Sequence, residues 1–203
     1  METITTIFFD IGGVCLTNGW DHISREKAAN KFSVDYEKFE TKHKSVFKKL
    51  EKGKISLDEY LDKVIFFTKR KFSKKEFKDF MFLQSKAHKS TLKLLHQLSL
   101  KNKYHLATIN NESLELNQYR INKFGLKKYF TNFFSSCYLG TRKPEPEIFL
   151  KALQILQKNP EKCLFIDDRE ENYLSAKSIG LNSIHLENPI ELKKKLTEFN
   201  IEI

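Results

Sequence analysis

The second half of the chain alternates between helical and extended segments, and this alternation limits the fold more than any other feature. From about residue 90 onwards, some stretches repeat apolar residues at helical spacing, and short runs rich in β-branched and aromatic residues lie between them. Strands that alternate with helices imply right-handed crossovers and a mostly parallel sheet. We therefore predict an α/β fold with about five parallel strands and helices on both faces of the sheet.

The bounds of these elements follow from the same periodicity and from the glycines, prolines and asparagines that flank it. The predicted strands cover residues 4–9, 105–109, 133–136, 163–166 and 182–186. The predicted helices cover residues 92–98, 112–124, 144–157, 172–179 and 190–199. The third of these helices is expected to begin at Pro144 or Pro146, because proline is favoured in the first helical turn.

The first predicted strand ends at Asp10, and Gly12 and Gly13 follow closely. In open parallel sheets, ligands bind in the crevice outside the carboxyl ends of the strands. An acid placed there, next to backbone that a ligand can approach closely, is a candidate reactive group. The alternative is that Asp10 only closes the strand by accepting hydrogen bonds from nearby backbone.

The segment that follows His22, up to about Lys86, is predicted to be helical throughout, and it contains no proline. Two capping boxes, at residues 56–59 and 73–76, precede apolar stripes at helical spacing. We interpret this segment as a small helical bundle inserted after the first strand. The predicted organisation is a core of residues 1–15 and 87–203 and a helical domain of residues 16–86.

Composition narrows the classes of protein to which the chain can belong. Of its 203 residues, 40% are hydrophobic, which is enough for a globular core. No apolar run approaches the ~20 residues needed to span a bilayer, and the N-terminal residues lack the features of a signal peptide, so we expect a cytoplasmic protein with no membrane partner. The net charge of +10 would suit an anionic partner. However, lysines alternate with acidic residues on the predicted helices, which argues against nucleic-acid binding.

Polar side chains end three of the predicted strands. They are Asp10, the pair Asn110 and Asn111, and the pair Asp167 and Asp168. Because the carboxyl ends of parallel strands meet at one edge of the sheet, these residues are expected to converge on one site. The two asparagine amides, with nearby backbone N–H groups, could form a cradle for an anion there.

This predicted site has the chemistry of phosphoryl transfer. Asp10 and Asp168 can supply hard oxygen ligands to Mg²⁺, and the carbonyl of Gly12 could add another. Such an ion commonly keeps waters and takes its remaining ligands from a phosphate group. Lys143 precedes a predicted helix and would bring a positive charge to the same edge. A carboxylate nucleophile beside a metal, a lysine and amide donors suits transfer through an aspartyl-phosphate.

Four motifs resemble, in chain order, those of the haloacid dehalogenase superfamily. They are residues 8–14 (FFDIGGV), 109–111 (INN), 140–149 (GTRKPEPEIF) and 165–168 (FIDD) with Asn172. The resemblance covers nearly the whole chain, and the helical insertion looks like the small cap domain of that family. Closest in pattern are its capped, Mg²⁺-dependent phosphatases, including sugar-phosphate phosphatases and the N-terminal domain of soluble epoxide hydrolase.

The resemblance implies a Rossmann-like core, a Mg²⁺ cofactor and a role for each matching residue. Asp10 would be the nucleophile and a metal ligand, and Gly12 would bind the metal through its backbone carbonyl. Asp168 would be the side-chain metal ligand, and Lys143 would stabilise the phosphoryl group. Supporting roles behind these ligands fall to Asp167 and Asn172. The implied reaction is hydrolysis of a small phosphorylated metabolite, a sugar phosphate being one candidate.

The chain departs from the family pattern at the end of the second predicted strand. The family usually carries serine or threonine there, whereas the count along the strand places Asn110 at that position. An amide can still donate to a phosphate oxygen. Thr108 points to the same face two residues earlier, so a shift in register would make Thr108 the contact instead.

A second departure concerns the general acid–base. Phosphatases of this family usually carry aspartate two residues after the nucleophile, where this chain has Gly12. Loss of a general acid–base typically lowers the rate by about 10²–10⁴-fold. His22 is the nearest titratable candidate to replace it, and its alternative role is a surface or cap-packing histidine.

The sequence therefore raises three possible functions. The first is a Mg²⁺-dependent phosphatase acting on a small phosphomonoester, and the second is a catalytically weak or inactive member that binds a phosphometabolite or a protein partner, as Gly12 would favour. The third is dehalogenase chemistry, against which the retained Asp168 argues. The cap residues expected to face the substrate are Trp20, His22, Lys52 and Lys54.

Overall fold

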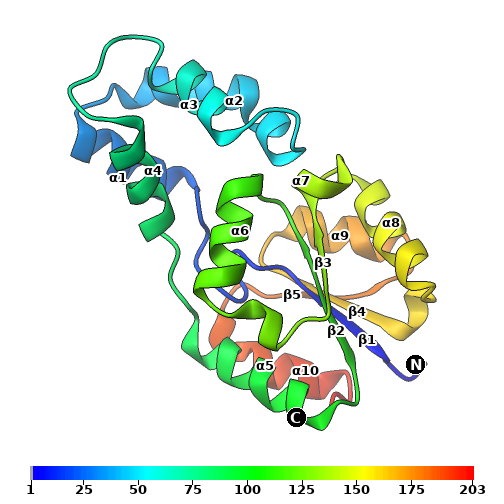
Figure 1. Cartoon of the computed structure of the whole chain (residues 1–203). Coiled ribbons are helices and arrows are strands. Elements are labelled where there is room, and N and C mark those ends of the chain that lie inside the picture. The colour runs from blue at the N-terminus through cyan, green and yellow to red at the C-terminus, as the bar shows by residue number, and fades with distance from the viewer. Residues whose placement is uncertain (1) are drawn as a thin grey trace.

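The computed structural model describes residues 2–203, and its sheet has five strands that all pair in parallel (Figure 1). The strands are β1 (Thr6–Phe9), β2 (His105–Asn110), β3 (Asn132–Ser135), β4 (Cys163–Asp167) and β5 (Asn182–His185). Their order is β3-β2-β1-β4-β5, so the chain winds outward on both sides of β1. The predicted α/β fold with five parallel strands is confirmed, and its topological switch point lies at β1, where such sheets bind ligands.

The helices fall into two groups within the described residues. Those of the inserted segment are α1 (His22–Phe32), α2 (Tyr36–Glu51), α3 (Leu57–Val64) and α4 (Lys74–Leu83). Those around the sheet are α5 (Lys89–Lys101), α6 (Leu114–Lys123), α7 (Ser136–Leu139), α8 (Pro146–Leu156), α9 (Glu170–Ser178) and α10 (Leu192–Glu198). Three short 3₁₀ turns complete them, at Leu126–Lys128, Pro160–Lys162 and Pro189–Glu191.

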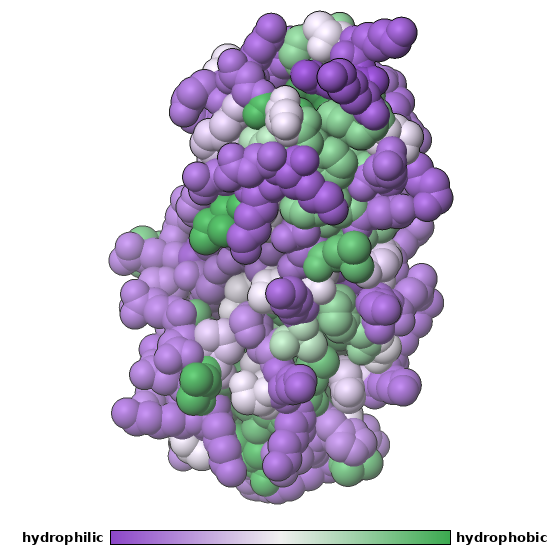
Figure 2. Space-filling model, turned by 90° about the vertical axis from the view of Figure 1, so that its left-hand side faces the viewer, coloured by the Kyte–Doolittle hydropathy of each residue, from purple (hydrophilic) through white to green (hydrophobic). Residues whose placement is uncertain are grey.

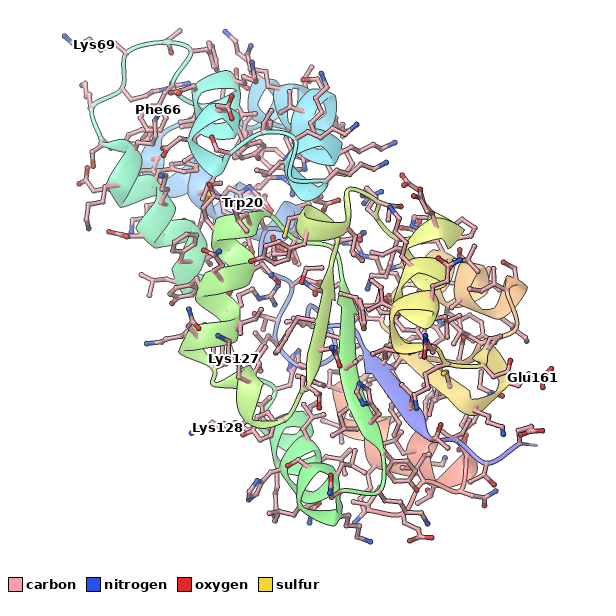
Figure 3. The ribbon with its side chains drawn as sticks, turned by 45° about the vertical axis from the view of Figure 1, so that its right-hand side comes forward. Trp20, Phe66, Lys69, Lys127, Lys128 and Glu161 are labelled. Atoms are coloured by element: carbon pink, nitrogen blue, oxygen red, sulfur yellow. The ribbon has the colours of Figure 1, made fainter. Side chains whose placement is uncertain are left out.

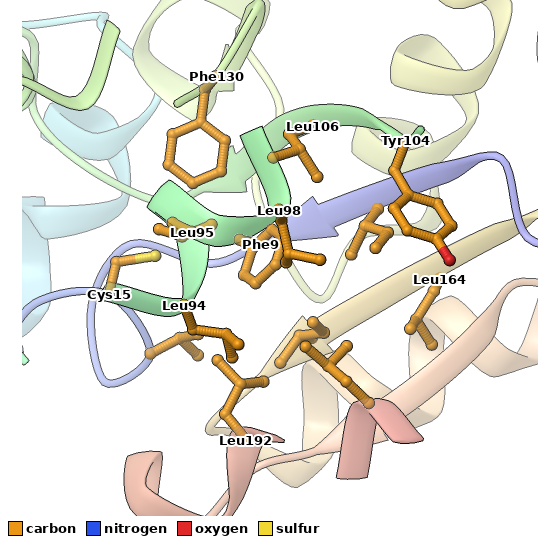
Figure 4. Packing of buried hydrophobic residues seen from close by; sticks show 14 of the residues in the cluster. Phe9, Cys15, Leu94, Leu95, Leu98, Tyr104, Leu106, Phe130, Leu164 and Leu192 are labelled. Atoms are coloured by element: carbon orange, nitrogen blue, oxygen red, sulfur yellow. The ribbon is translucent and has the colours of Figure 1, made fainter. Parts of the chain in front are cut away.

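Alternation along the strands gives the sheet two apolar faces, each covered by helices. Phe9, Leu106 and Ile166 belong to the cluster on one face, which α5 and α10 cover (Figure 4). Phe8 and Phe165 belong to the cluster on the other face, which α8 and α9 cover. Burial of both faces explains why the strands read as nearly continuous apolar runs rather than as alternating ones.

The inserted segment has an apolar core of its own, whose buried residues lie between 28 and 81 and are separate from both faces of the sheet. The two predicted capping boxes are confirmed. Ser56 caps α3 and Ser73 caps α4, and in each case the glutamate three residues later bonds back to the cap residue. Figure 1 shows the four helices stacked beyond the carboxyl ends of the strands.

The chain leaves and re-enters the core at one point. Thr17 N donates to Lys86 O at 2.8 Å, and His88 N donates to Cys15 O at 3.0 Å, so the two connections run side by side. These bonds lie at the predicted division between residues 1–15 with 87–203 and residues 16–86. The division itself stays a prediction.

Some predicted bounds differ from the structure for local reasons. The helix expected at 112–124 begins at Leu114, because Ser113 is still extended. The last helix begins at Leu192 rather than 190, because a 3₁₀ turn at Pro189–Glu191 precedes it. The helix expected at Pro144 or Pro146 begins at Pro146, after a cis peptide bond between Lys143 and Pro144. Helix α7 was not predicted, since four residues carry no periodicity.

Hydrophilic side chains cover most of the face seen in Figure 2, and apolar residues form small patches between them. Along residues 2–203 no helix is both long enough and apolar enough to cross a membrane.

Candidate active site

A cavity of about 340 Å³ lies between the carboxyl edge of the sheet and the inserted helices. Its floor includes Asp10, Asn111 and Lys143. Asp10 follows β1, Asn111 follows β2, and Lys143 precedes α8. Its other walls come from α1, α2 and α6 and from the connection that carries Trp20, which Figure 3 places where the two parts of the molecule meet. The predicted convergence of distant strand ends on one site is therefore seen in the structure.

Asp10 follows β1 directly, and its backbone N–H donates to Ile166 O at 2.8 Å. Its carboxylate oxygen Oδ1 accepts from the Ile11 N–H at 2.7 Å and forms an ion pair with Lys143 Nζ at 2.9 Å. Burial raises the pKa of Asp10 to about 7, against the lowering effect of Lys143 and together with the repulsion of Asp167 and Asp168. No protein group among residues 2–203 donates to its other oxygen, Oδ2, which leaves that atom available for reaction.

Lys143 is 1% exposed, and its ammonium bridges two carboxylates. The Nζ atom lies 2.9 Å from Asp10 Oδ1 and 2.6 Å from Asp167 Oδ2. Burial alone would lower the pKa of Lys143, but these two carboxylates raise it, so the side chain stays charged. Asn111 holds the backbone of Lys143 at both polar atoms, since its amide donates to Lys143 O and accepts from Lys143 N, each at 2.8 Å.

Asp167 is fully buried and satisfied by protein donors. Its Oδ1 accepts from Asn172 Nδ2 and from the Arg169 backbone N–H, both at 2.9 Å, while Oδ2 accepts from Lys143. Asn172, near the start of α9, thus fixes Asp167, and Asp167 fixes Lys143. Asn172 also lines the cavity, whereas Asp167 does not, and the supporting roles of both residues stay a prediction.

Asp168 has an oxygen that the protein leaves unsatisfied. Its Oδ2 accepts from Asn18 Nδ2 at 3.2 Å, whereas its buried Oδ1 has no hydrogen-bond partner within the described residues. Asp10, Asp167 and Asp168 each offer one oxygen, and these oxygens lie within 4.8 Å of one another. Three clustered carboxylates with one orphaned oxygen are the donor set that a hard divalent cation prefers, so the residues present fit Mg²⁺.

A side chain at either glycine after Asp10 would meet a neighbouring side chain. A Cβ atom on Gly13, whose φ is +76°, would lie 2.2 Å from Asp168 Cγ. A Cβ atom on Gly12 would lie 2.9 Å from Asn18 Oδ1. Asn18 therefore fills the space in which an acid–base side chain at position 12 would begin. The sequence did not predict a role for Asn18, because nothing in its spacing relates it to Asp168.

The prediction that Asn110 contacts the phosphate is not supported by its position. Asn110 Nδ2 donates to Asn117 Oδ1 at 3.0 Å, and Ser135 Oγ donates to Asn110 Oδ1 at 2.9 Å, so its polar atoms are used inside the core. Thr108 pairs in register with Phe9 and is fully buried. Of the residues at this strand end, Asn111 lines the cavity and Asn110 does not. A one-residue step along a strand changes the face on which a side chain lies, which is why only one of the two predicted asparagines reaches the cavity.

The inserted helices supply much of the remaining wall. Trp20 and His22 line the cavity as predicted, but Lys52 does not, because its ammonium lies 2.7 Å from Glu145. Lys54 lies outside the cavity lining as well. Several lining residues of α2 were missed, because helical spacing alone does not show which face of a cap helix lies toward the cavity: Glu40, His43, Phe47, Leu50 and Glu51.

Buried ion pairs make this wall polar. Arg25 of α1 pairs with Glu40 of α2, and Arg120 NH1 of α6 lies 2.9 Å from Glu112 Oε2. Arg120 also donates to Thr17 O at 2.6 Å, which ties α6 to the connection leading to the inserted helices. The cavity thus combines an acidic floor that can hold a cation and a phosphate with walls that can hydrogen-bond a polar group.

Comparisons with known proteins agree with this geometry. Residues 4–180 match the family model of haloacid dehalogenase-like hydrolases. A flavin mononucleotide hydrolase of Arabidopsis thaliana chloroplasts is 30% identical over 164 residues, which are 81% of this chain and 66% of that protein. The D-ribitol-5-phosphate phosphatase of Bacteroides thetaiotaomicron is 27% identical over 206 residues, which are 96% of this chain and 97% of that enzyme.

A crystal structure of a haloacid dehalogenase family enzyme from Bacteroides thetaiotaomicron, in complex with magnesium and inorganic phosphate, is similar to the whole fold. It superposes with a TM-score of 0.75 and 25% sequence identity, over 89% of this chain and 93% of that one.

Proposed function

The chain belongs to the haloacid dehalogenase-like hydrolases, and we propose that it is a Mg²⁺-dependent phosphatase that hydrolyses a small phosphomonoester through an aspartyl-phosphate on Asp10. The observation that carries the proposal is the cluster of carboxylates at this edge. Asp10 is paired through Oδ1 with the Lys143 ammonium, and it lies in one cluster with Asp168, whose Oδ1 is unsatisfied. Two relatives are named as hydrolases of phosphate esters, and one similar structure contains magnesium and phosphate.

Asp10, Asp168 and the carbonyl of Gly12 would hold the Mg²⁺ ion. When bound, the ion supplies positive charge that orients and neutralises phosphoryl oxygens. The orphaned oxygen of Asp168 supports this assignment, because a buried oxygen with no partner is destabilising unless a donor or a cation occupies its lone pairs.

The residues of the chain would act in two steps. Asp10 Oδ2 attacks phosphorus, the bond from phosphorus to the ester oxygen breaks, and the leaving oxygen takes a proton from water in the cavity. Water then attacks the phosphorus of the acyl phosphate, and its proton is lost to solvent as Asp10 and inorganic phosphate are released. Lys143 has three N–H donors and uses two on Asp10 and Asp167, so one remains for a phosphoryl oxygen.

Gly12 predicts slow turnover rather than none. A protein acid–base group normally raises the rate by about 10²–10⁴-fold, and water must replace that group here. The nucleophile, lysine and metal ligands remain, and charge stabilisation usually contributes more to the rate than proton transfer does. The same glycine favours a second candidate function, in which the chain binds a phosphometabolite or a protein partner without hydrolysing it.

Domain organisation belongs to the same proposal. Residues 16–86 would form the cap, and residues 1–15 with 87–203 would form the catalytic core. The cavity lies between the two, and closure of such a cap would exclude water from the reacting groups.

The test is a panel assay with and without Mg²⁺. The panel contains p-nitrophenyl phosphate, D-ribitol 5-phosphate, flavin mononucleotide and phosphoglycolate, and Asp10→Asn is the control variant. We expect Mg²⁺-dependent release of phosphate from at least one ester and no release by Asp10→Asn. Tight binding of an ester without turnover would favour the second candidate, and turnover by Asp10→Asn would refute the role of Asp10.

A further inference from the structure

Three side chains of the inserted segment form a hydrogen-bond chain that ends at the cavity. Trp20 Nε1 lies 3.1 Å from the hydroxyl of Tyr60, and that hydroxyl lies 2.8 Å from Nδ1 of His43. Trp20 precedes α1, Tyr60 belongs to α3 and His43 belongs to α2, so the chain joins three separate elements. Tyr60 is fully buried, whereas Trp20 and His43 line the cavity.

Counting the protons of this chain fixes the tautomer of His43. An indole N–H can only donate, so the Tyr60 oxygen must accept from Trp20. The single phenolic proton is then buried and needs an acceptor, and within residues 2–203 the remaining partner is His43 Nδ1. Since Nδ1 accepts, the proton of the neutral imidazole sits on Nε2.

The surroundings of His43 keep the ring neutral. Burial lowers the pKa of His43 to about 4, and the positive charges of Arg25 and Lys44 act in the same direction, against Glu40. Arg25 comes from α1, and Glu40 and Lys44 come from α2. At neutral pH His43 is therefore a hydrogen-bond donor at Nε2 without a net charge.

Packing also holds the imidazole ring of His43 in place. The His43 ring stacks on Phe47 with centroids 5.0 Å apart and an interplanar angle of 22°. The ring of Tyr60 meets it edge-on, at 5.9 Å and 88°. Nδ1 is bound to Tyr60, and no protein group among residues 2–203 accepts from Nε2. A polar N–H without a protein partner in the wall of a cavity is available to a ligand.

We propose that His43 is a specificity-determining residue, which donates from Nε2–H to an uncharged oxygen, a hydroxyl or a carbonyl, on the leaving group of the substrate. The proposal rests on the proposed function, because it places the phosphoryl group at Asp10 and the leaving group against the inserted helices. The Nε2–H donor of His43 selects esters of polyols and similar oxygen-bearing alcohols over esters whose leaving group has no hydrogen-bond acceptor. Tyr60 and Trp20 are positioning residues that hold the tautomer.

The first test reads the tautomer and does not depend on activity. Two-bond ¹H–¹⁵N correlation spectra of the ¹⁵N-labelled protein at pH 7 distinguish protonation at Nε2 from protonation at Nδ1, and His43→Gln identifies the signal. We expect His43 to be neutral and protonated at Nε2, and Tyr60→Phe to release part of the population to the Nδ1–H form. A neutral His43 protonated at Nδ1, or a charged ring, would overturn the proposal.

The second test measures binding in the Asp10→Asn background with Mg²⁺ present, so that turnover does not interfere. D-ribitol 5-phosphate is compared by calorimetry with inorganic phosphate, which has no leaving group. We expect His43→Phe to weaken binding of the ester about tenfold, as loss of one hydrogen bond to a ligand does, and to leave the affinity for phosphate unchanged. His43→Gln, which keeps an N–H donor, should recover part of the loss. His96→Phe is the matched control, because His96 is exposed on α5 and is not among the residues that line the cavity.

The outcomes separate this proposal from the proposed function. Two results would show that His43 makes no contact with a leaving group. One is an equal loss of affinity for ester and phosphate in His43→Phe, and the other is equal affinity of the two ligands before substitution. Absence of phosphatase activity across the panel, together with the expected tautomer and the expected loss of ester affinity, would refute hydrolysis and leave His43 as a ligand-reading residue.

Discussion

Gly13 packs closely against the carboxylate of Asp168, the proposed metal ligand. Replacing this glycine tests whether the position of that carboxylate matters for Mg²⁺ binding. An added Cβ would lie 2.2 Å from both Cγ and Oδ2 of Asp168, which is far inside van der Waals contact. The carboxylate would have to swing away, because it is the movable partner. We predict that Gly13→Ala weakens Mg²⁺ binding and Mg²⁺-dependent turnover by about 10–100-fold, the usual effect of disturbing a ligand or its support.

The same substitution also has a backbone cost that must be separated from this effect. Gly13 has a φ of +76°, and an alanine held in that left-handed region costs about 1–2 kcal/mol. For a chain of this length, that corresponds to a fall in melting temperature of about 2–8 °C. Gly140 provides the matched control, because its φ is +69° and an added Cβ there would meet nothing within 4 Å.

The assay compares Gly13→Ala with Gly140→Ala. Melting temperatures without metal should fall by similar amounts in both variants. Calorimetric titration with Mg²⁺ and turnover of p-nitrophenyl phosphate should change only in Gly13→Ala. Equal Mg²⁺ affinities in the two variants would refute the reasoning, since they would show that the position of the Asp168 carboxylate does not matter for metal binding.

Three further predictions concern the floor and the wall of the cavity. Lys143→Met should lower the free energy of unfolding by about 3–5 kcal/mol in urea titrations, because two buried carboxylates lose their counter-ion. Lys151→Met is the control, because Lys151 forms an exposed ion pair, and it should change this free energy by less than about 1 kcal/mol. Gly12→Asp should not raise kcat for p-nitrophenyl phosphate, because Asn18 fills the space that the new side chain needs; an increase of tenfold or more would contradict this. His43→Gln should make the free energy of unfolding less dependent on pH between about 4 and 6.5. In that window the unfolded histidine binds a proton and the folded one does not, so the parent protein loses stability as the pH falls; parallel curves for the two proteins would contradict the lowered pKa of His43.

The core of the fold was predictable because its determinants are local and regular. The apolar runs that became β1 and β4 are buried on both faces, and their periodicity needs no knowledge of the remaining chain. The meeting of Asp10 with Asp168 followed from a topological rule, since parallel strands bring their carboxyl ends to one edge. Lys143 was identified from the motif that it shares with a family and from its place before α8.

Other parts of the site depend on packing that no local pattern encodes. Asn18 reaches Asp168 across 150 positions of sequence through one side-chain hydrogen bond. Both Asn110 and Asn111 were predicted to contact the phosphate, but they lie on opposite faces at a strand end and have different partners. His43 belongs to the site because α2 turns that side toward the cavity, and helical spacing alone does not say which face of a cap helix packs inward.

The most direct test of phosphoryl transfer to Asp10 is to trap the intermediate. The protein is mixed with Mg²⁺ and its best phosphate ester, quenched in acid during the first turnover, and digested for peptide mass spectrometry. We predict one phosphoryl group on the peptide that contains Asp10, and none on that peptide from Asp10→Asn. Phosphate release in the first turnover without any phosphorylated Asp10, or a phosphoryl group carried by another residue, would contradict the mechanism.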